Sequence, residues 1–230
     1  MSAPARPGTR FTSLALANWR NFGRVQVDLE RRVFLVGPNA SGKSNFLDVF
    51  RFLHDIASVG GGFQAAVGRR GGVSAIRSLS ARRYPDIEIR VAIGSDETPE
   101  TWVYELALSQ DNQRRPLIKR ERVTRGRREL LNRPDAGDLT DPERLTQTFL
   151  EQVNVNQEFR DVADFFASVR YLHLVPQLVR EPERSVGHPN DPFGGDFLEQ
   201  IARTNKPTQG ARLRKIAEAL PHSRTPAPGA

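Results

Sequence analysis

The sequence predicts an α/β fold that carries an inserted antiparallel β-meander and flanking helices. Three observations support this prediction: alternating apolar and polar residues near the start of the chain, one strongly amphipathic helix after them, and a second group of alternating segments separated by turn residues. The chain has 230 residues, of which 38% are hydrophobic and 27% are charged, so it is apolar enough to bury a core. We expect one lobe over residues 11–220, between disordered ends at residues 1–10 and 221–230.

Residues 11–57 contain the first predicted elements. Phe11–Asn18 and Arg24–Leu29 alternate as half-buried strands do, and Val33–Val36 is a continuous apolar run that is typical of a buried strand. Ser44–Ala57 has the spacing of a helix whose apolar residues form one stripe. The opposite face of that helix carries Asp48, Arg51 and Asp55.

The later segments predict a loop, an antiparallel insertion and a helical region. Residues 60–72 are rich in glycine and predict the loop, and residues 85–131 predict the insertion. The strands of this insertion are expected over residues 87–93, 102–108 and 117–124. Residues 141–220 are expected to be mainly helical, with Asp141 as the first N-cap and one strand over residues 171–175. The helices are expected over residues 141–153, 158–169, 197–203 and 212–220.

One motif carries recognisable chemistry. Residues 37–44, Gly-Pro-Asn-Ala-Ser-Gly-Lys-Ser, fit the pattern G-x-x-x-x-G-K-[ST] between a predicted strand and a predicted helix. Glycine lets successive backbone N–H groups turn inward, and the N-terminus of the helix adds a partial positive charge. We therefore expect a loop that binds ATP and Mg²⁺, in which Lys43 reaches the β- and γ-phosphates and Ser44 is a metal ligand.

The composition excludes several classes of protein. With no cysteine and four scattered histidines, the chain is not expected to hold a disulfide scaffold, a thiol nucleophile or a zinc site. The loop lacks the G-x-G-x-x-G pattern of dinucleotide-binding proteins, and no N-K-x-D motif supports guanine specificity. No window approaches the roughly 18 apolar residues that a membrane span requires. We expect a cytoplasmic protein without membrane contact.

Two segments together resemble a known family. Asn18-Trp-Arg-Asn-Phe22 and, some residues later, Gly37–Asn45 are similar to the N-terminal half of the ABC-like P-loop ATPases of the SMC and RecF type, and most of all to the bacterial ATPases related to OLD (overcoming lysogenization defect) proteins. These families show N-[FYW]-[RK]-x-F followed by G-x-N-[GA]-[SA]-G-K-[ST]-[NT], and every position matches. The resemblance is specific over residues 11–57 and looser beyond them.

This resemblance implies an ATP-binding lobe that acts in DNA repair or phage defence. The nucleotide-binding residues that it implies are Arg20, Gly37, Pro38, Asn39, Ala40, Ser41, Gly42, Lys43, Ser44 and Asn45. These families have a glutamine at the end of a later strand that senses Mg²⁺ and the attacking water. Gln177, at the end of the predicted strand over residues 171–175, resembles that glutamine. Lys43 and Gln177 are then the implied catalytic residues, and Ser44 and Gln177 the implied metal ligands. A solvated turn residue at Arg20 and an ordinary loop glutamine at Gln177 remain alternatives.

Two elements of such ATPases are absent from the sequence. The chain has neither an apolar strand that ends in Asp-Glu nor a signature of the Leu-Ser-Gly-Gly-Gln kind, and the family places both in a C-terminal lobe. The resemblance therefore implies a site completed by a second ATPase lobe or by a head-to-tail homodimer, held together through ATP. Alone, the chain is expected to bind ATP weakly and to hydrolyse it slowly or not at all. A small-molecule kinase would also need an acidic strand.

A basic stretch over residues 114–128 suggests a different function. The chain has a formal charge of +7, and much of its positive charge lies in this stretch. It could bind DNA phosphates with an affinity that falls as the salt concentration rises, which would make the protein a nucleic-acid-binding module with a vestigial P-loop. The alternative is a solvated outer face of the sheet, because no aromatic residues are interleaved for base stacking.

Overall fold

The computed structural model describes residues 8–79, 81, 86–173, 175–181, 193 and 195–219. The chain divides into two compact units, Met1–Val169 and Arg170–Ala230. Apart from residues 8–10, the ends expected to be disordered lie outside the described residues. The single lobe expected over residues 11–220 remains a prediction.

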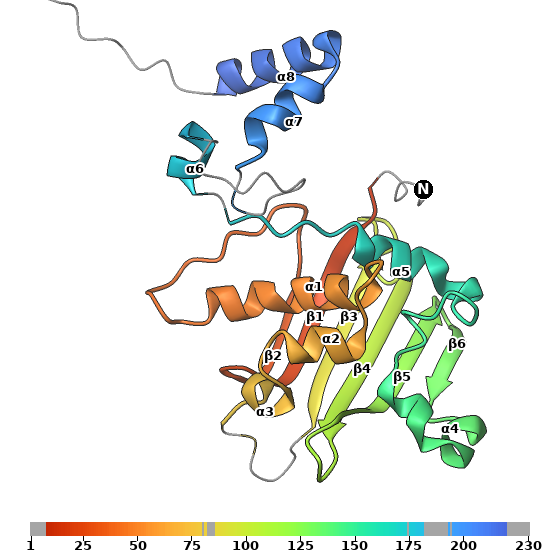
Figure 1. Ribbon diagram of the computed structural model, residues 1–230. Helices are drawn as coiled ribbons and strands as arrows, with labels where there is room; N and C mark the ends of the chain where they lie inside the picture. Colours follow the sequence, from red (N-terminus) through yellow and green to blue (C-terminus); the bar gives the residue numbers. More distant parts are fainter. Residues whose placement is uncertain are drawn as a thin grey trace, which may run out of the picture. The chain divides into compact units, whose positions relative to one another are not determined.

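The first unit is built on one six-stranded antiparallel sheet with the strand order β2-β1-β3-β4-β5-β6 (Figure 1). The strands are β1 (Arg10–Trp19), β2 (Phe22–Asp28), β3 (Ile87–Gly94), β4 (Trp102–Gln110), β5 (Pro116–Arg125) and β6 (Arg128–Arg133). The first two predicted strands and the three strands of the meander are confirmed, whereas β6 was not expected. The meander is not a separate insertion, because β3 pairs directly with β1 and places Val91 opposite Leu14. One sheet then buries the apolar face of both segments together.

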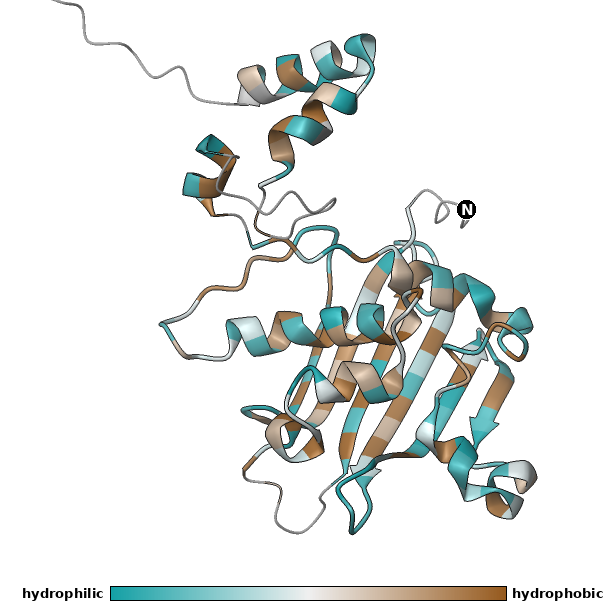
Figure 2. Ribbon diagram, in the orientation of Figure 1, coloured by the Kyte–Doolittle hydropathy of each residue, from teal (hydrophilic) through white to brown (hydrophobic). Residues whose placement is uncertain are grey.

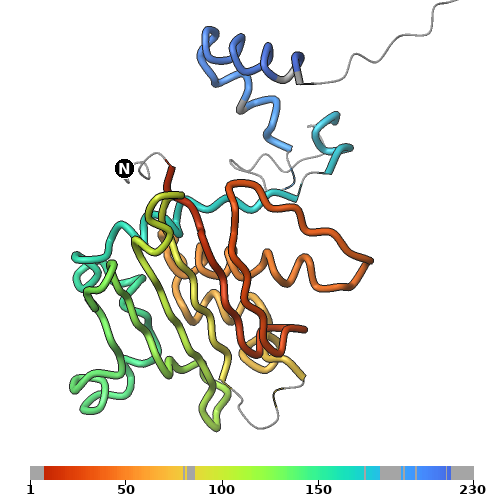
Figure 3. Tube along the Cα trace, turned by 180° about the vertical axis from the view of Figure 1, so that it is seen from behind, coloured from red at the N-terminus to blue at the C-terminus, as the bar shows by residue number. Residues whose placement is uncertain are grey.

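Three helices cover one face of this sheet: α1 (Lys43–Ala57), α2 (Phe63–Gly68) and α5 (Arg160–Ala167) (Figure 1). Helix α1 packs against both others. The strands alternate between hydrophobic and hydrophilic residues along their length (Figure 2), and Leu14, Val49 and Phe166 are fully buried between the layers. On the opposite face of the sheet, the described residues of this unit form no helix (Figure 3). The predicted helices over residues 44–57 and 158–169 are thus confirmed, the latter beginning with a short 3-10 turn at Gln157–Phe159.

The glycine-rich interval is not a simple loop. It contains α2, which buries Phe63, Ala66 and Val67, and it is followed by α3 (Val73–Ile76). Apolar residues spaced three and four apart reach the core and outweigh the flanking glycines. The backbone N–H of Phe63 donates to the Glu151 carboxylate at 2.6 Å, which caps the start of α2. Asp55 also differs from expectation, because it is buried and pairs with Arg70 at 2.9 Å instead of facing solvent.

The predicted strand over residues 33–36 does not form. Phe34 and Val36 are 84% and 92% exposed, while Leu35 between them packs against the core. The segment is therefore extended with two apolar side chains facing outward. A strand requires a neighbour to bond its backbone N–H and C=O groups, and the described part of the chain supplies none here.

The prediction of one helix over residues 141–153 is also wrong, because the helix that begins there is much shorter. Asp141 is an N-cap, and its side chain accepts from Glu143 N–H, but it begins a 3-10 helix over Pro142–Thr146, preceded by α4 (Ala136–Thr140). Beyond it the backbone turns toward a buried carboxylate on β5. Glu121 accepts the N–H groups of Phe149 at 2.8 Å and Leu150 at 3.2 Å. These side-chain bonds take donors that a longer helix would use.

The second unit contains three helices among its described residues: α6 (Pro176–Arg180), α7 (Phe197–Arg203) and α8 (Lys206–Ala219). The helices predicted over residues 197–203 and 212–220 are confirmed as α7 and α8, except that Leu220 lies outside the described residues. The strand predicted over residues 171–175 is wrong where it is described. Val175 is instead the N-cap of α6, since Pro176 favours the first helical position and ends an extended run. In the described part of the chain, no helix has the length and apolar character to cross a membrane.

Candidate functional site

Residues 37–45 form a loop that ends in the first turn of α1. Ser41 N–H donates to Pro38 O at 3.3 Å, and Ala40 adopts a left-handed backbone with a φ of 64°. The first hydrogen bond of the helix runs from Phe46 N–H to Gly42 O at 2.9 Å. The N–H groups of residues 43–45 precede this bond, so they are free to point along the helix axis toward the loop. A helix N-terminus of this kind is an anion-binding site.

Both glycines of the motif occupy positions where a side chain would collide. A Cβ at Gly42 would lie 2.3 Å from Asn21 Nδ2, and the φ of Gly42 is 100°. A Cβ at Gly37 would lie 2.9 Å from Ser41 Oγ. The positive φ of Gly42 therefore accounts for glycine at that position of the motif.

Lys43 lies across the loop. Its Nζ donates to Gly37 O at 2.8 Å and to Pro38 O at 2.6 Å, and lies 3.5 Å from Ser41 Oγ. An ammonium group has three donors, and here all three have acceptors in the loop, of which Ser41 Oγ is the most distant and the easiest for a ligand oxygen to replace. The Ser44 side chain is exposed at the start of α1, where a metal bound to phosphate could reach it.

Arg20 is held away from the loop. Its Nη1 donates to Ala75 O at 3.1 Å, and its Nη2 lies 3.4 Å from Asp48 Oδ2, on the α1 turn beyond Ser44. The Asp48 carboxylate also accepts hydrogen bonds from Arg70 Nη2 at 2.9 Å and from Arg70 Nε at 3.0 and 3.2 Å. The structure thus places Arg20 beside α1 rather than among the loop residues, and its contact with nucleotide remains a prediction.

Gln177 belongs to the second unit, where it is exposed on α6. The phosphate-binding loop belongs to the first unit. Its role as a metal ligand and catalytic residue remains a prediction.

Asn21 is a residue of the site that sequence reasoning missed. Its Nδ2 donates to Ser41 O at 3.3 Å, and its Oδ1 accepts from Asn45 Nδ2 at 2.9 Å. Trp19 Nε1 in turn donates to Asn45 O at 2.8 Å. Asn21 falls on the unspecified position of the N-[FYW]-[RK]-x-F pattern, so the motif itself gave no signal. Only the contact between the β1–β2 turn and the loop reveals it.

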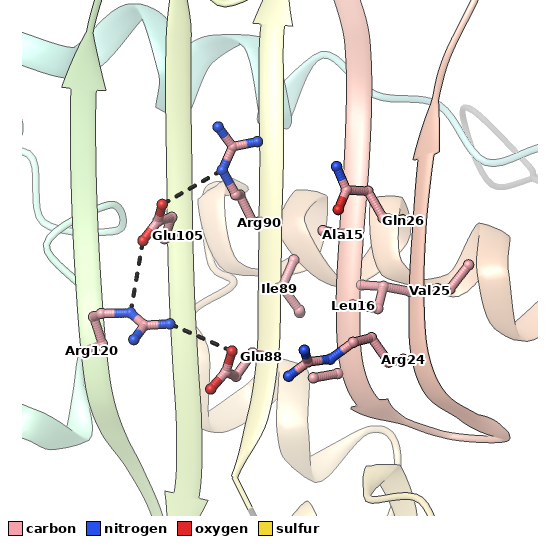
Figure 4. A pocket seen from close by; sticks show the side chains of 11 residues that line it. Ala15, Leu16, Arg24, Val25, Gln26, Glu88, Ile89, Arg90, Glu105 and Arg120 are labelled. Carbon is pink, nitrogen blue, oxygen red and sulfur yellow. Dashed lines mark ion pairs between the residues drawn. The ribbon is translucent and has the colours of Figure 1, made fainter. Parts of the chain in front are cut away.

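Four of the eight basic residues over residues 114–128 form ion pairs with acidic residues. Arg120 lies 3.6 Å from Glu88 and 3.7 Å from Glu105, beside a shallow hollow of about 310 Å³ (Figure 4). Further pairs of the stretch are Arg115 with Asp111 and Glu143, Arg122 with Glu129, and Arg128 with Glu158. DNA binding by this stretch and a solvated outer face both remain predictions.

Comparison with known proteins assigns the chain to a family. Residues 32–215 match the family described as "AAA domain, putative AbiEii toxin, Type IV TA system". The chain is also similar to Endonuclease GajA from Bacillus cereus (strain VD045), with 39% identity over 46 residues. That similarity covers 20% of this chain and 8% of the length of GajA. Because the family match includes the phosphate-binding loop and most of the chain, the protein belongs to the AAA domain family and is a nucleotide-binding P-loop ATPase domain.

Proposed function

We propose that this chain is the ATP-binding lobe of an ABC-like ATPase of the SMC, RecF and OLD-related type, acting in DNA repair or phage defence. Bound ATP and Mg²⁺ promote its association with a second ATPase lobe. The observation that carries the proposal is the loop itself, in which the Lys43 ammonium and the first N–H groups of α1 meet in one place. Each charge-assisted hydrogen bond contributes roughly 1.5–3 kcal/mol, so several that converge on one triphosphate suffice for micromolar binding after the cost of association.

The partner in this proposal is a second lobe or a second copy of the chain. Phe34 and Val36 form an exposed apolar pair immediately before the loop. The backbone beside them makes no strand pairing within the described residues, so it can accept a strand from another lobe. Association at this place would bring the partner next to the bound phosphates.

Hydrolysis is expected to depend on that partner. Phosphoryl transfer to water needs a carboxylate for Mg²⁺ and a group that orients the water. Asp48, the carboxylate one helical turn beyond Ser44, is occupied by Arg20 and Arg70. The proposal therefore assigns the missing acidic group to the second lobe, with Gln177 as a further contact to Mg²⁺.

Calorimetric titration of the purified chain with ATP and Mg²⁺ tests the binding. Lys43→Ala should abolish measurable affinity without a change in the circular dichroism spectrum, because it removes the ammonium but no buried group. Lys119→Ala, at an exposed position of β5, is the matched control and should bind as the unmodified chain does. Unchanged affinity in Lys43→Ala would contradict the proposed site, and rapid steady hydrolysis by the chain alone would contradict the need for a partner.

DNA binding by residues 114–128 is retained as a separate prediction. Filter binding at rising salt concentration tests it, because phosphate contacts weaken steeply as ions compete. ATP-dependent dimerisation separates the two functions, since a nucleic-acid-binding module with a vestigial loop would not dimerise with ATP.

A further inference from the structure

The amide of Asn21 lies directly over the junction between the phosphate-binding loop and α1. Its Nδ2 donates to Ser41 O, and the same nitrogen is so close to Gly42 that a Cβ there would lie 2.3 Å from it. The contact joins the β1–β2 turn to the loop across 20 positions of the chain.

This contact determines which way the peptide between Ser41 and Gly42 faces. In a trans peptide the C=O and N–H groups point in opposite directions. While Asn21 holds the Ser41 carbonyl on its own side, the Gly42 N–H must point to the other side, along with the N–H groups of residues 43–45. A reversed peptide would point a carbonyl oxygen, with its partial negative charge, at the bound phosphates.

Gly42 makes such a reversal easy. Its φ is 100°, and rotation of the preceding peptide by half a turn would bring φ to about −80°, a conformation open to glycine and other residues alike. The loop therefore needs an external restraint at this point. Trp19 is fully buried, and its Nε1 donates a hydrogen bond to Asn45 O. The Nδ2 of Asn45 in turn donates to Asn21 Oδ1. The Nδ2 of Asn21 is thereby directed at Ser41 O.

We propose that Asn21 is a positioning residue that keeps the Ser41–Gly42 peptide in the orientation required for phosphate binding. The inference rests on the proposed ATP-binding function and adds a residue that acts through the loop rather than on the nucleotide. Asn21→Ala should weaken ATP binding about 3- to 10-fold, the effect of one net hydrogen bond. Asn21→Leu should weaken it similarly, because leucine keeps the bulk over Gly42 but cannot donate.

Nuclear magnetic resonance can observe the peptide itself. Ser41–Gly42 is the only Ser-Gly step in the sequence, so labelling serine carbonyls with ¹³C and glycine amides with ¹⁵N gives one correlated signal for this peptide. The unmodified chain should show a single signal that shifts when ATP is added. Both Asn21 variants should show a broadened or second signal before ATP is added, at a position different from the random-coil signal that an unfolded population would give. Asn132→Ala, at an exposed asparagine on the far edge strand, is the control and should match the unmodified chain.

The possible results separate the inference from the function. If the unmodified chain binds ATP and both Asn21 variants bind it equally well with one unchanged signal, the positioning role is wrong and the ATP site stands. If the unmodified chain does not bind ATP, the proposed function fails and the inference fails with it. Weaker binding together with the altered signal in both variants supports the inference.

Discussion

Gly42 is the residue on which the shape of the phosphate-binding loop depends most directly. Its φ of 100° is a backbone conformation that residues with a side chain rarely adopt, and a Cβ here would displace the Asn21 amide. The motif alone predicted a glycine here and the Lys43 position after it. It could not predict Asn21, because the contact that selects this residue joins positions that are distant in the chain.

We predict that Gly42→Ala abolishes ATP binding and lowers the free energy of unfolding by about 1–2 kcal/mol, the cost of a left-handed alanine. Gly68→Ala is the matched control, since a Cβ there meets nothing within 4 Å and the residue ends α2. It should leave ATP binding unchanged and raise stability by up to about 1 kcal/mol. Titration with ATP and thermal unfolding measure both effects, and tolerance of alanine at Gly42 would contradict the geometry of the loop.

A second prediction at this scale concerns Gln177. Gln177→Ala should leave ATP affinity unchanged but reduce Mg²⁺-dependent turnover when a second lobe is present, because the side chain is proposed to contact the metal rather than the phosphates. Parallel titration and phosphate-release assays measure the two quantities. Equal turnover in Gln177→Ala and the unmodified chain would contradict a role in catalysis and support the alternative, an ordinary loop glutamine.

At the scale of elements, a buried cluster of ion pairs connects β5, β6 and α4. Arg133 lies 3.0 Å from Glu121 and 2.8 Å from Asp138, and all three side chains are fully buried. Burial raises the pKa of Glu121, although the N–H of Phe149 and the charge of Arg133 act in the opposite direction. The cluster therefore depends on each of its partners.

We predict that Arg133→Met lowers the free energy of unfolding by about 3–5 kcal/mol, because it leaves Glu121 buried without its counter-ion and Asp138 with Arg144 alone. Arg128→Met removes an exposed partner of Glu158 and should cost less than about 1 kcal/mol. Chemical denaturation of both variants provides the comparison. A similar decrease in the free energy of unfolding in both variants would show that the buried cluster stabilises the fold no more than the exposed ion pair does.

A pH effect is expected where Asp96 joins separate elements. Hydrogen bonds from Arg10 and Arg31 lower the pKa of Asp96 below its ordinary value of 3.8. A carboxyl whose pKa is lower in the folded state stabilises the fold above its unfolded pKa, and this contribution is lost as the pH falls through the folded pKa. Asp96→Asn should therefore reduce the difference in melting temperature between about pH 7 and about pH 3. A difference as large as in the unmodified chain would contradict this.

For the whole molecule, local sequence patterns predicted individual helices and strands, but they did not predict which strands pair across long distances in the chain. The helix at Lys43–Ala57 and the strand at Arg10–Trp19 were predictable because their patterns are contained in the segments themselves. The pairing of β1 with β3, which makes one sheet of two predicted parts, depends on segments far apart. Residues 33–36 show the converse, since their apolar pattern predicts a strand whose neighbour the described chain does not supply.

We predict that Phe34→Asp weakens ATP-dependent association about tenfold or more while leaving ATP binding intact, because burying a phenylalanine contributes about 1.5–3 kcal/mol. Leu139→Asp, at an exposed leucine of α4, is the matched control and should not affect association. Sedimentation velocity with and without ATP measures the effect. Association that persists unchanged in Phe34→Asp would place the partner elsewhere.

The bond between Phe63 N–H and the Glu151 carboxylate has a consequence for how the protein is synthesised. The two residues are 88 positions apart, so α2 lacks its acceptor until the ribosome has released the segment that follows β6. During translation, the region beside α1 therefore stays without its final cap while all six strands emerge.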